Sequence, residues 1–207
     1  MENNFNEQDS LRLINEMIAQ ARNNFRKGAG NSSILWGYTI AILAMFNFIF
    51  SYILEFRHYA SWVWILTIPI FIGNYWYGYR KAKKAEVITH LDRVVDTVWL
   101  GFFISNTFFV SSTFFIAITQ KTYVPYLFIT PIIMIMVGLA LFVTAKACRF
   151  KPYLYGAYIF WLGAVLCILQ YALVKSVDLG LVILSVSMIL GFVIPGHILN
   201  RKAESNV

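Results

Sequence analysis

The chain has 207 residues, of which 59% are hydrophobic and 13% are Asp, Glu, Lys or Arg, and its mean hydropathy is +0.64. Soluble domains carry about 25% charged residues, so this composition excludes an ordinary soluble domain and indicates a polytopic membrane protein. The formal net charge of +7 does not indicate a nucleic-acid partner. The basic residues lie at the ends of apolar segments, where cytoplasmic retention and attraction to anionic lipid headgroups account for them.

Residues 6–27 are predicted to form an amphipathic helix that ends at the Gly-Ala-Gly-Asn segment 28–31. Three roles remain open for its apolar face. It could lie on the inner leaflet, dock a cytoplasmic or membrane protein partner or a second copy of the chain, or close the cytoplasmic mouth of the bundle. The residues of this face follow a spacing of three and four: Leu11, Ile14, Ile18, Ala21 and Phe25.

Six apolar segments follow, and each has the ~20 residues needed to cross a hydrocarbon core of ~30 Å. We predict that they span 33–54, 59–78, 95–118, 124–145, 152–174 and 178–199. Three connections between them are very short, which favours three antiparallel hairpins. The predicted fold is therefore all-α, a polytopic membrane helix bundle with an N-terminal amphipathic cytoplasmic helix. The expected units are 1–30 for the helix and joint, 31–200 for the bundle and 201–207 for a cytoplasmic tail.

The distribution of basic residues predicts the orientation. Fourteen of the 17 Lys and Arg residues fall in the N-terminal segment, the 79–94 and 146–151 connections and the C-terminal tail. Arg57, Lys121 and Lys175 fall on the opposite side. Cytoplasmic connections carry the excess of Lys and Arg, so both termini are expected in the cytoplasm.

Polar residues within a span point to a site, because each needs a partner or water at membrane depth. Asp92, Asp96, Asn106 and Thr113 share one face of the third span with Trp99 and Phe103. Two explanations remain open. The carboxylates could start the helix and neutralise nearby basic residues, or the four polar residues could line a solute or ion pathway. Three further amides are expected to form hydrogen bonds between helices: Asn47, Asn74 and Gln170.

Prolines occur in the second, fourth and sixth spans, at Pro69, Pro131 and Pro195. A proline removes one intrahelical hydrogen bond and tends to kink its helix. These residues are expected either to shape the packing or to act as hinges around a cavity.

Motifs for the common enzyme classes are missing from the sequence. It has no His-Glu-x-x-His, no Gly-x-Ser-x-Gly and no phosphate-binding glycine loop. The three histidines are far apart in the predicted topology and do not suggest one metal site. We therefore expect no enzyme, no cofactor and no bound metal.

The segment Leu11 to Phe25, with Ile34-Leu-Trp-Gly-Tyr38, resembles the start of a family of small six-span proteins of the bacterial inner membrane. The segment 92–99 and Arg149-Phe-Lys-Pro152, with Gly156 and Trp161, are similar to later landmarks of that family. The resemblance implies the architecture and a multi-pass location in the cytoplasmic membrane. The family has no assigned activity, so it implies no site residues.

Two functions remain open. The chain could be a membrane-anchored module that senses or binds a partner through its N-terminal helix, in contact with the lipid bilayer and with a homodimer as a further expectation. Alternatively, it could be a small-solute or ion transporter or channel that uses the polar stripe of the third span.

Overall fold

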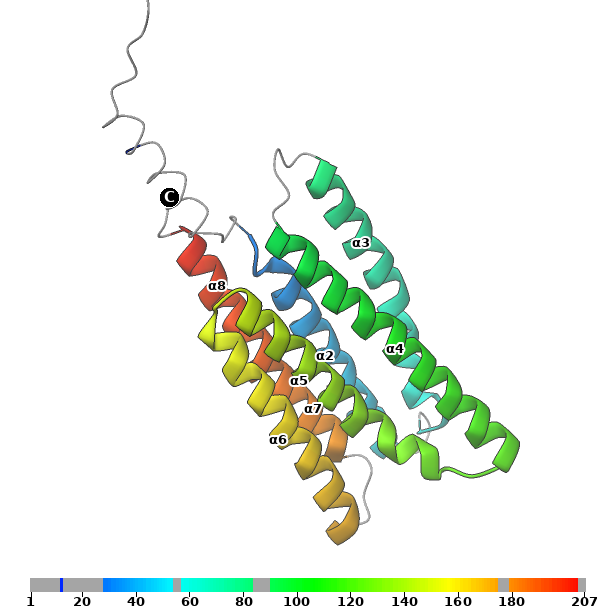
Figure 1. Cartoon of the computed structure of the whole chain (residues 1–207). Helices are drawn as coiled ribbons and strands as arrows, with labels where there is room; N and C mark the ends of the chain where they lie inside the picture. The colour runs from blue at the N-terminus through cyan, green and yellow to red at the C-terminus, as the bar shows by residue number, and fades with distance from the viewer. Residues whose placement is uncertain (1–11, 13–27, 54–56, 84–89, 175–178, 205–207) are drawn as a thin grey trace, which may run out of the picture.

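The computed structural model describes residues 12, 28–53, 57–83, 90–174 and 179–204. Over these residues the chain is built of helices and turns, without strands. Figure 1 shows a bundle of helices that run nearly side by side. In chain order, with η for the non-α helical segments, the elements are α2 (Asn31–Tyr52), η1 (Arg57–Leu66), α3 (Thr67–Lys83), α4 (His90–Gln120), η2 (Val124–Phe128), α5 (Ile129–Ala147), α6 (Lys151–Val174), α7 (Leu179–Met188), η3 (Ile189–Val193) and α8 (Ile194–Glu204).

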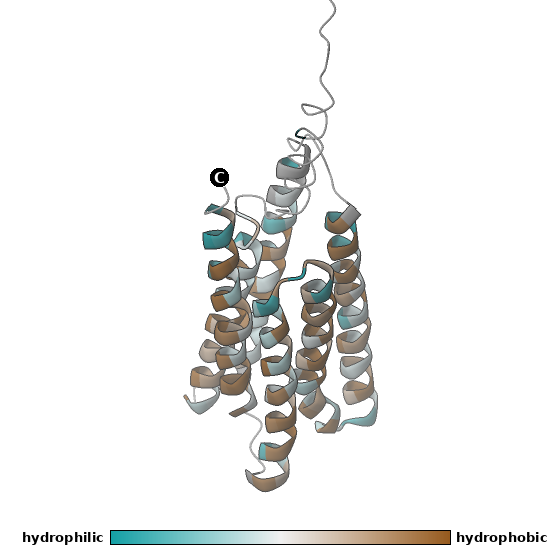
Figure 2. Cartoon of the chain, turned by 60° about the vertical axis from the view of Figure 1, so that its left-hand side comes forward, coloured by the Kyte–Doolittle hydropathy of each residue, from teal (hydrophilic) through white to brown (hydrophobic). Residues whose placement is uncertain are grey.

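Five helices in the described residues are long and apolar enough to cross a membrane. They are Asn31–Tyr52, Leu91–Gln120, Val124–Ala147, Lys151–Leu173 and Leu179–Glu204. Figure 2 shows hydrophobic residues along their shafts and hydrophilic residues gathered towards the ends. A lipid environment favours helices because every backbone polar group must be satisfied within the segment. The apolar composition is consistent with a membrane protein.

The six-span prediction is not confirmed as a whole. The predicted span 59–78 is divided between η1, a 3-10 helix of 10 residues, and α3, an α-helix of 17 residues. The last helix also continues to Glu204, so the predicted boundary at residue 200 falls inside α8. The three-hairpin arrangement is not confirmed either. The most extensive packing joins α5 to α6, which belong to different predicted hairpins, and α3 touches α2 only sparsely.

The core is formed by α2, α5, α6 and the last helix, which consists of α7, η3 and α8. Its largest fully buried side chains are Phe160, Met134 and Leu141. Small residues let the backbones approach closely, as is common between membrane helices. A Cβ atom at Gly156 on α6 would overlap the carbonyl oxygen of Gly191 on η3. Gly156 therefore lies at a close contact between α6 and the last helix.

Helix α4 is attached differently from the core helices. No Cα atom of its described residues comes within 8 Å of a Cα atom of α2 or α3, and its backbone approaches only α5 and η2. Aromatic rings cross the remaining space. Phe103 contacts Trp36 of α2 and Phe71 of α3, with ring centroids 6.2 and 5.0 Å apart, and Trp99 contacts Phe192 of η3 at 5.5 Å. Helix α4 is therefore joined to α2, α3 and η3 by aromatic rings, whereas its close backbone contacts are with α5 and η2.

The prolines lie at junctions between helix types. Pro69 is the third residue of α3 after η1, Pro131 is the third residue of α5 after η2, and Pro195 is the second residue of α8 after η3. The first turn of a helix tolerates a residue without an N–H group. Segment η3 is a π-helix, a wider turn that relieves the clash of the Pro195 ring with the preceding turn. The hinge role of these prolines stays a prediction.

The turns that end α4 and α5 have the same construction. Lys121 and Arg149 have φ angles of 49° and 50°, and each is followed by an amide N–H that bonds back across the turn, from Thr122 to Ala117 and from Phe150 to Ala145. This is the Schellman arrangement, which satisfies the last carbonyl groups of a helix. Both turns place a basic side chain at a position that glycine usually occupies.

Candidate functional site

Three consecutive residues at the start of α2 each bind a different helix. The Asn200 side chain of α8 donates to Asn31 Oδ1 at 2.6 Å, and the Asn74 side chain of α3 donates to Ser32 Oγ at 3.3 Å. Ser33 Oγ shares a hydrogen bond of 2.7 Å with Tyr153 Oη of α6. The first turn of α2 is thus tied to α8, α3 and α6.

Gly30, the residue before α2, makes two further contacts with α8. The Gly30 amide donates to Asn200 Oδ1 at 2.8 Å, and its Cα is so close to Gly196 that a Cβ atom would overlap the Gly196 carbonyl oxygen. Only glycine fits such an approach between two backbones. We call Gly30, Asn31, Ser32 and Ser33, with Asn74, Tyr153, Gly196 and Asn200, the α2 junction. The N-terminal segment enters the bundle at this junction.

The α2 junction was only partly predictable. Asn74 was expected to bond between helices, and this prediction is confirmed. Asn31, Ser32, Ser33 and Asn200 were not singled out, because helix ends in a polar flank look solvated in a sequence. The bond between Ser33 and Tyr153 joins residues 120 positions apart, and no local pattern indicates such a pair.

A group of titratable side chains lies beside the α2 junction. Burial raises the pKa of the Cys148 thiol, in the turn between α5 and α6, and the negative charge of Asp92 on α4 raises this pKa further. Cys148 also lies near Tyr153. Asp92 is in the first turn of α4, where the helix dipole favours a carboxylate. The start of α4 therefore meets the α5–α6 turn at the same end of the bundle as the α2 junction.

The predicted polar stripe of α4 is spread along the helix and is not gathered into one site. Asp92 is half-buried, and Asp96 is exposed. Deeper along the helix, Asn106 Oδ1 is buried without a hydrogen-bond partner. Thr113 is buried, but its hydroxyl donates to the Phe109 carbonyl of its own helix at 2.8 Å. Among the four residues of the stripe, the side-chain oxygen that most needs a partner or water belongs to Asn106.

Other candidate residues are placed as follows. The apolar face of the N-terminal helix (Leu11, Ile14, Ile18 and Phe25) lies outside the described residues. His197 is exposed, and its ring contacts that of Tyr38 at 6.3 Å. Within the described part of the chain, no group of three or more His, Cys, Asp and Glu residues is arranged to hold a metal ion.

Comparison of the chain with protein-family models, with curated proteins and with solved structures found no match. The assignment of a function therefore depends on the geometry of the α2 junction and of α4.

Proposed function

We propose that the protein is a membrane-anchored sensing or partner-binding module, in which the N-terminal segment captures a protein partner and the α2 junction passes this event to the bundle. The observation that supports the proposal is the set of bonds from Asn31, Ser32 and Ser33 to three helices. A displacement of the chain at Gly30 would disturb α8, α3 and α6 together. A joint with no signalling role would need only one flexible connection.

We further propose that the bundle crosses the membrane six times, with both termini on the cytoplasmic side. Gly30 bonds Asn200, so α2 starts where α8 ends, and α4 starts beside Cys148 at the same end. After leaving this end along α2, the chain returns to it through residues 57–83. A 3-10 helix of 10 residues followed by an α-helix of 17 residues reaches about 45 Å, which exceeds a hydrocarbon core of ~30 Å. In this orientation the helix ends that carry most of the Lys and Arg residues face the cytoplasm, and the membrane is a bacterial inner membrane.

The first experiment tests partner capture. Three proteins are compared: the full-length protein, an Ile14→Asn/Ile18→Asn variant and an Asn15→Gln/Asn23→Gln control. Each is crosslinked in membranes of the source cells, and the proteins captured with it are identified by mass spectrometry. We expect a partner that the unaltered protein and the control capture and that the Ile14/Ile18 variant loses. Equal capture by both variants, or capture of only further copies of the chain, would contradict the proposal.

The second experiment tests the α2 junction as the transmitter. Cys148 lies beside Tyr153, so its alkylation rate reports on this end of the bundle. Partner binding is expected to change that rate in the unaltered protein and not in an Asn31→Ala/Ser32→Ala/Ser33→Ala variant that still captures the partner. The same change in rate in both proteins would show that the signal does not pass through these bonds.

The alternative function is a small-solute or ion transporter or channel. The buried side-chain oxygen of Asn106, which has no hydrogen-bond partner, favours it. In vesicles containing the purified protein, Asp96→Asn and Asn106→Ala should each reduce flux while the melting temperature in detergent stays nearly unchanged. A parallel loss of thermal stability would assign both residues to packing.

A further inference from the structure

We propose that the exposed face of the α5–α6 hairpin binds one phospholipid with an anionic headgroup. Its cations would hold the headgroup phosphate, and the apolar residues of the same face would lie along the acyl chains. The site is independent of the proposed partner-binding role. It rests on the charge of one turn, on two aligned stripes of side chains and on a fixed aromatic floor.

The turn between α5 and α6 concentrates positive charge. Lys146, Arg149 and Lys151 lie within six residues, and all three are exposed. Residues 129–174, which form both helices and the turn, contain no Asp or Glu. Asp92 of α4 acts on Cys148 in this turn, so one carboxylate compensates part of the three charges and leaves a positive excess. Such clusters at the cytoplasmic ends of membrane helices attract anionic headgroups.

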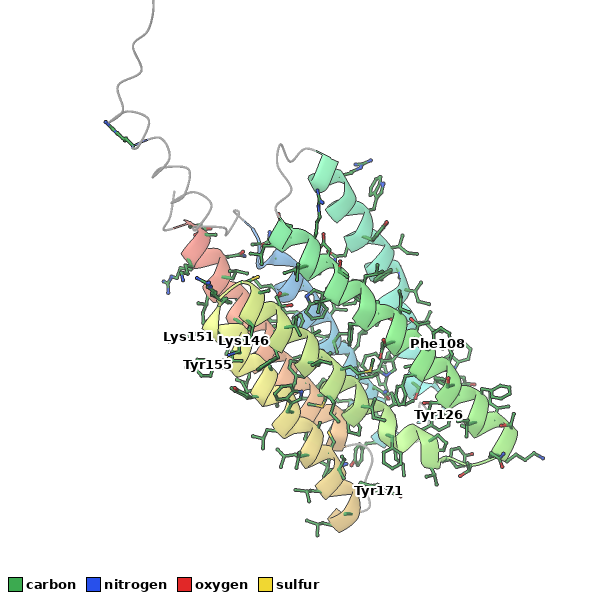
Figure 3. The ribbon with its side chains drawn as sticks, in the orientation of Figure 1. Phe108, Tyr126, Lys146, Lys151, Tyr155 and Tyr171 are labelled. Carbon is green, nitrogen blue, oxygen red and sulfur yellow. The ribbon has the colours of Figure 1, made fainter. Side chains whose placement is uncertain are left out.

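Lys146 and Lys151 each lie at one end of a stripe of exposed apolar side chains, one stripe on α5 and one on α6. Residues three and four apart share a helical face, which aligns Leu139 and Val143 with Lys146 on α5, and Tyr155, Tyr158 and Leu162 with Lys151 on α6. All of these apolar side chains are exposed. Figure 3 labels Lys146, Lys151 and Tyr155 at the end of the hairpin where α5 turns into α6. Each stripe therefore changes from cationic to apolar in the direction in which a lipid changes from headgroup to acyl chain.

Aromatic side chains form a rigid floor between the stripes. Trp161 Nε1 donates to the Ile135 carbonyl at 3.2 Å, which fixes the indole of α6 against α5. The Phe142 and Tyr158 rings lie 5.6 and 5.9 Å from it. Lys146 Nζ lies 5.5 Å from the centroid of the Phe142 ring, so its cation is held over this floor. The surface is preformed, which lowers the entropy lost on binding.

A lipid explains this face better than a free anion does. The apolar stripes continue the cationic end over several helical turns, and a free phosphate would leave them unused. Three other basic residues of the described part of the chain, Arg80, Arg201 and Lys202, lack one part of the combination. Arg80 is already stacked on Trp76, 3.4 Å from the ring centroid, and Arg201 and Lys202 end a single helix without a paired stripe.

The test uses the purified full-length protein in mild detergent and native mass spectrometry. Dioleoyl phosphatidylglycerol and dioleoyl phosphatidylcholine are titrated separately, so that only the headgroup differs. The unaltered protein is compared with Lys146→Gln/Lys151→Gln and with Arg201→Gln/Lys202→Gln, which removes the same charge elsewhere. The Lys146→Arg/Lys151→Arg variant keeps the charge and controls for damage to the turn.

We expect one phosphatidylglycerol to bind the unaltered protein more tightly than phosphatidylcholine. Loss of two basic side chains near the headgroup should weaken this binding roughly 30-fold, while the Arg201/Lys202 control and the arginine variant retain it. An excess of glycerol 3-phosphate should not displace the lipid. Equal affinity for both lipids, an equal loss in the Arg201/Lys202 control, loss in the arginine variant or displacement by glycerol 3-phosphate would each overturn the proposal.

Discussion

At the scale of single residues, the pKa of Cys148 depends on a charge on the neighbouring helix α4. Its pKa is raised first by burial and then by the charge of Asp92. Because the thiolate is the reactive form, a raised pKa lowers the fraction of reactive thiol at any given pH. Asp92→Asn should lower the pKa of Cys148 and speed its alkylation by iodoacetamide a few-fold at mildly alkaline pH.

This prediction is checked by mass spectrometry of the alkylated peptide across a series of pH values. Cys167, which is buried, serves as an internal reference. Asp96→Asn is the matched control, because Asp96 lies one turn away and does not contribute to the shift at Cys148. Equal acceleration by both substitutions would show that the effect is not the charge of Asp92.

Two asparagines in the bundle should respond oppositely to the same substitution. Asn106 Oδ1 is buried without a partner, so Asn106→Leu removes an unsatisfied group and should leave the melting temperature in detergent unchanged or higher. Asn200 bonds the Gly30 amide and Asn31. Asn200→Leu should therefore lose about 1 to 3 kcal/mol of stability. A large loss of stability in Asn106→Leu would indicate a hydrogen bond to water that the protein needs.

At the scale of elements, glycines show where helices touch. Gly156 on α6 faces Gly191 of η3 so closely that a Cβ atom would overlap its carbonyl, whereas Gly101 on α4 has nothing within 4 Å of a Cβ position. Gly156→Ala should cost about 1 to 3 kcal/mol through overpacking. Gly101→Ala should add up to about 1 kcal/mol, since alanine favours a helix over glycine.

Thermal unfolding of the two variants in the same detergent checks this prediction. The substitution is chemically identical and both sites are in helix interiors, so the comparison isolates the contact. Similar melting temperatures for the two variants would mean that α6 and η3 are not packed as closely as the structure has them.

The helices themselves could be predicted from the sequence, but their contacts could not. Apolar stretches of sufficient length predict α2 and α6 to within two residues at each end, because lipid requires internal hydrogen bonding. Phe192 and Trp99 are 93 positions apart, yet their rings are in contact, and Phe192 lies in the π-helix Ile189–Val193. Neither feature has a local signature. The polar stripe of α4 was visible as a spacing, but that spacing does not show that Asp96 is exposed while the side-chain oxygen of Asn106 is buried.

At the scale of the whole molecule, the number of membrane crossings depends on whether residues 57–83, which form η1 and α3, cross the membrane. In a protein without native cysteines, single cysteines are introduced as Tyr59→Cys, Arg80→Cys, Lys121→Cys and Arg201→Cys. A membrane-impermeant maleimide applied to intact cells should label positions 59 and 121 and should label 80 and 201 only after the membrane is opened. Labelling of 59 and 80 from the same side would mean that η1 and α3 do not cross.

The bonds at the start of α2 also tell where the chain can be divided. A chain shortened to begin at Gly28 keeps the Gly30 contact with Gly196 and all three side-chain bonds to α8, α3 and α6. A chain that begins at Ile34 loses all of them. The contacts that fix the start of α2 therefore all begin at or after Gly30, so exchanging the residues before Gly28 for a foreign segment would keep every one of them.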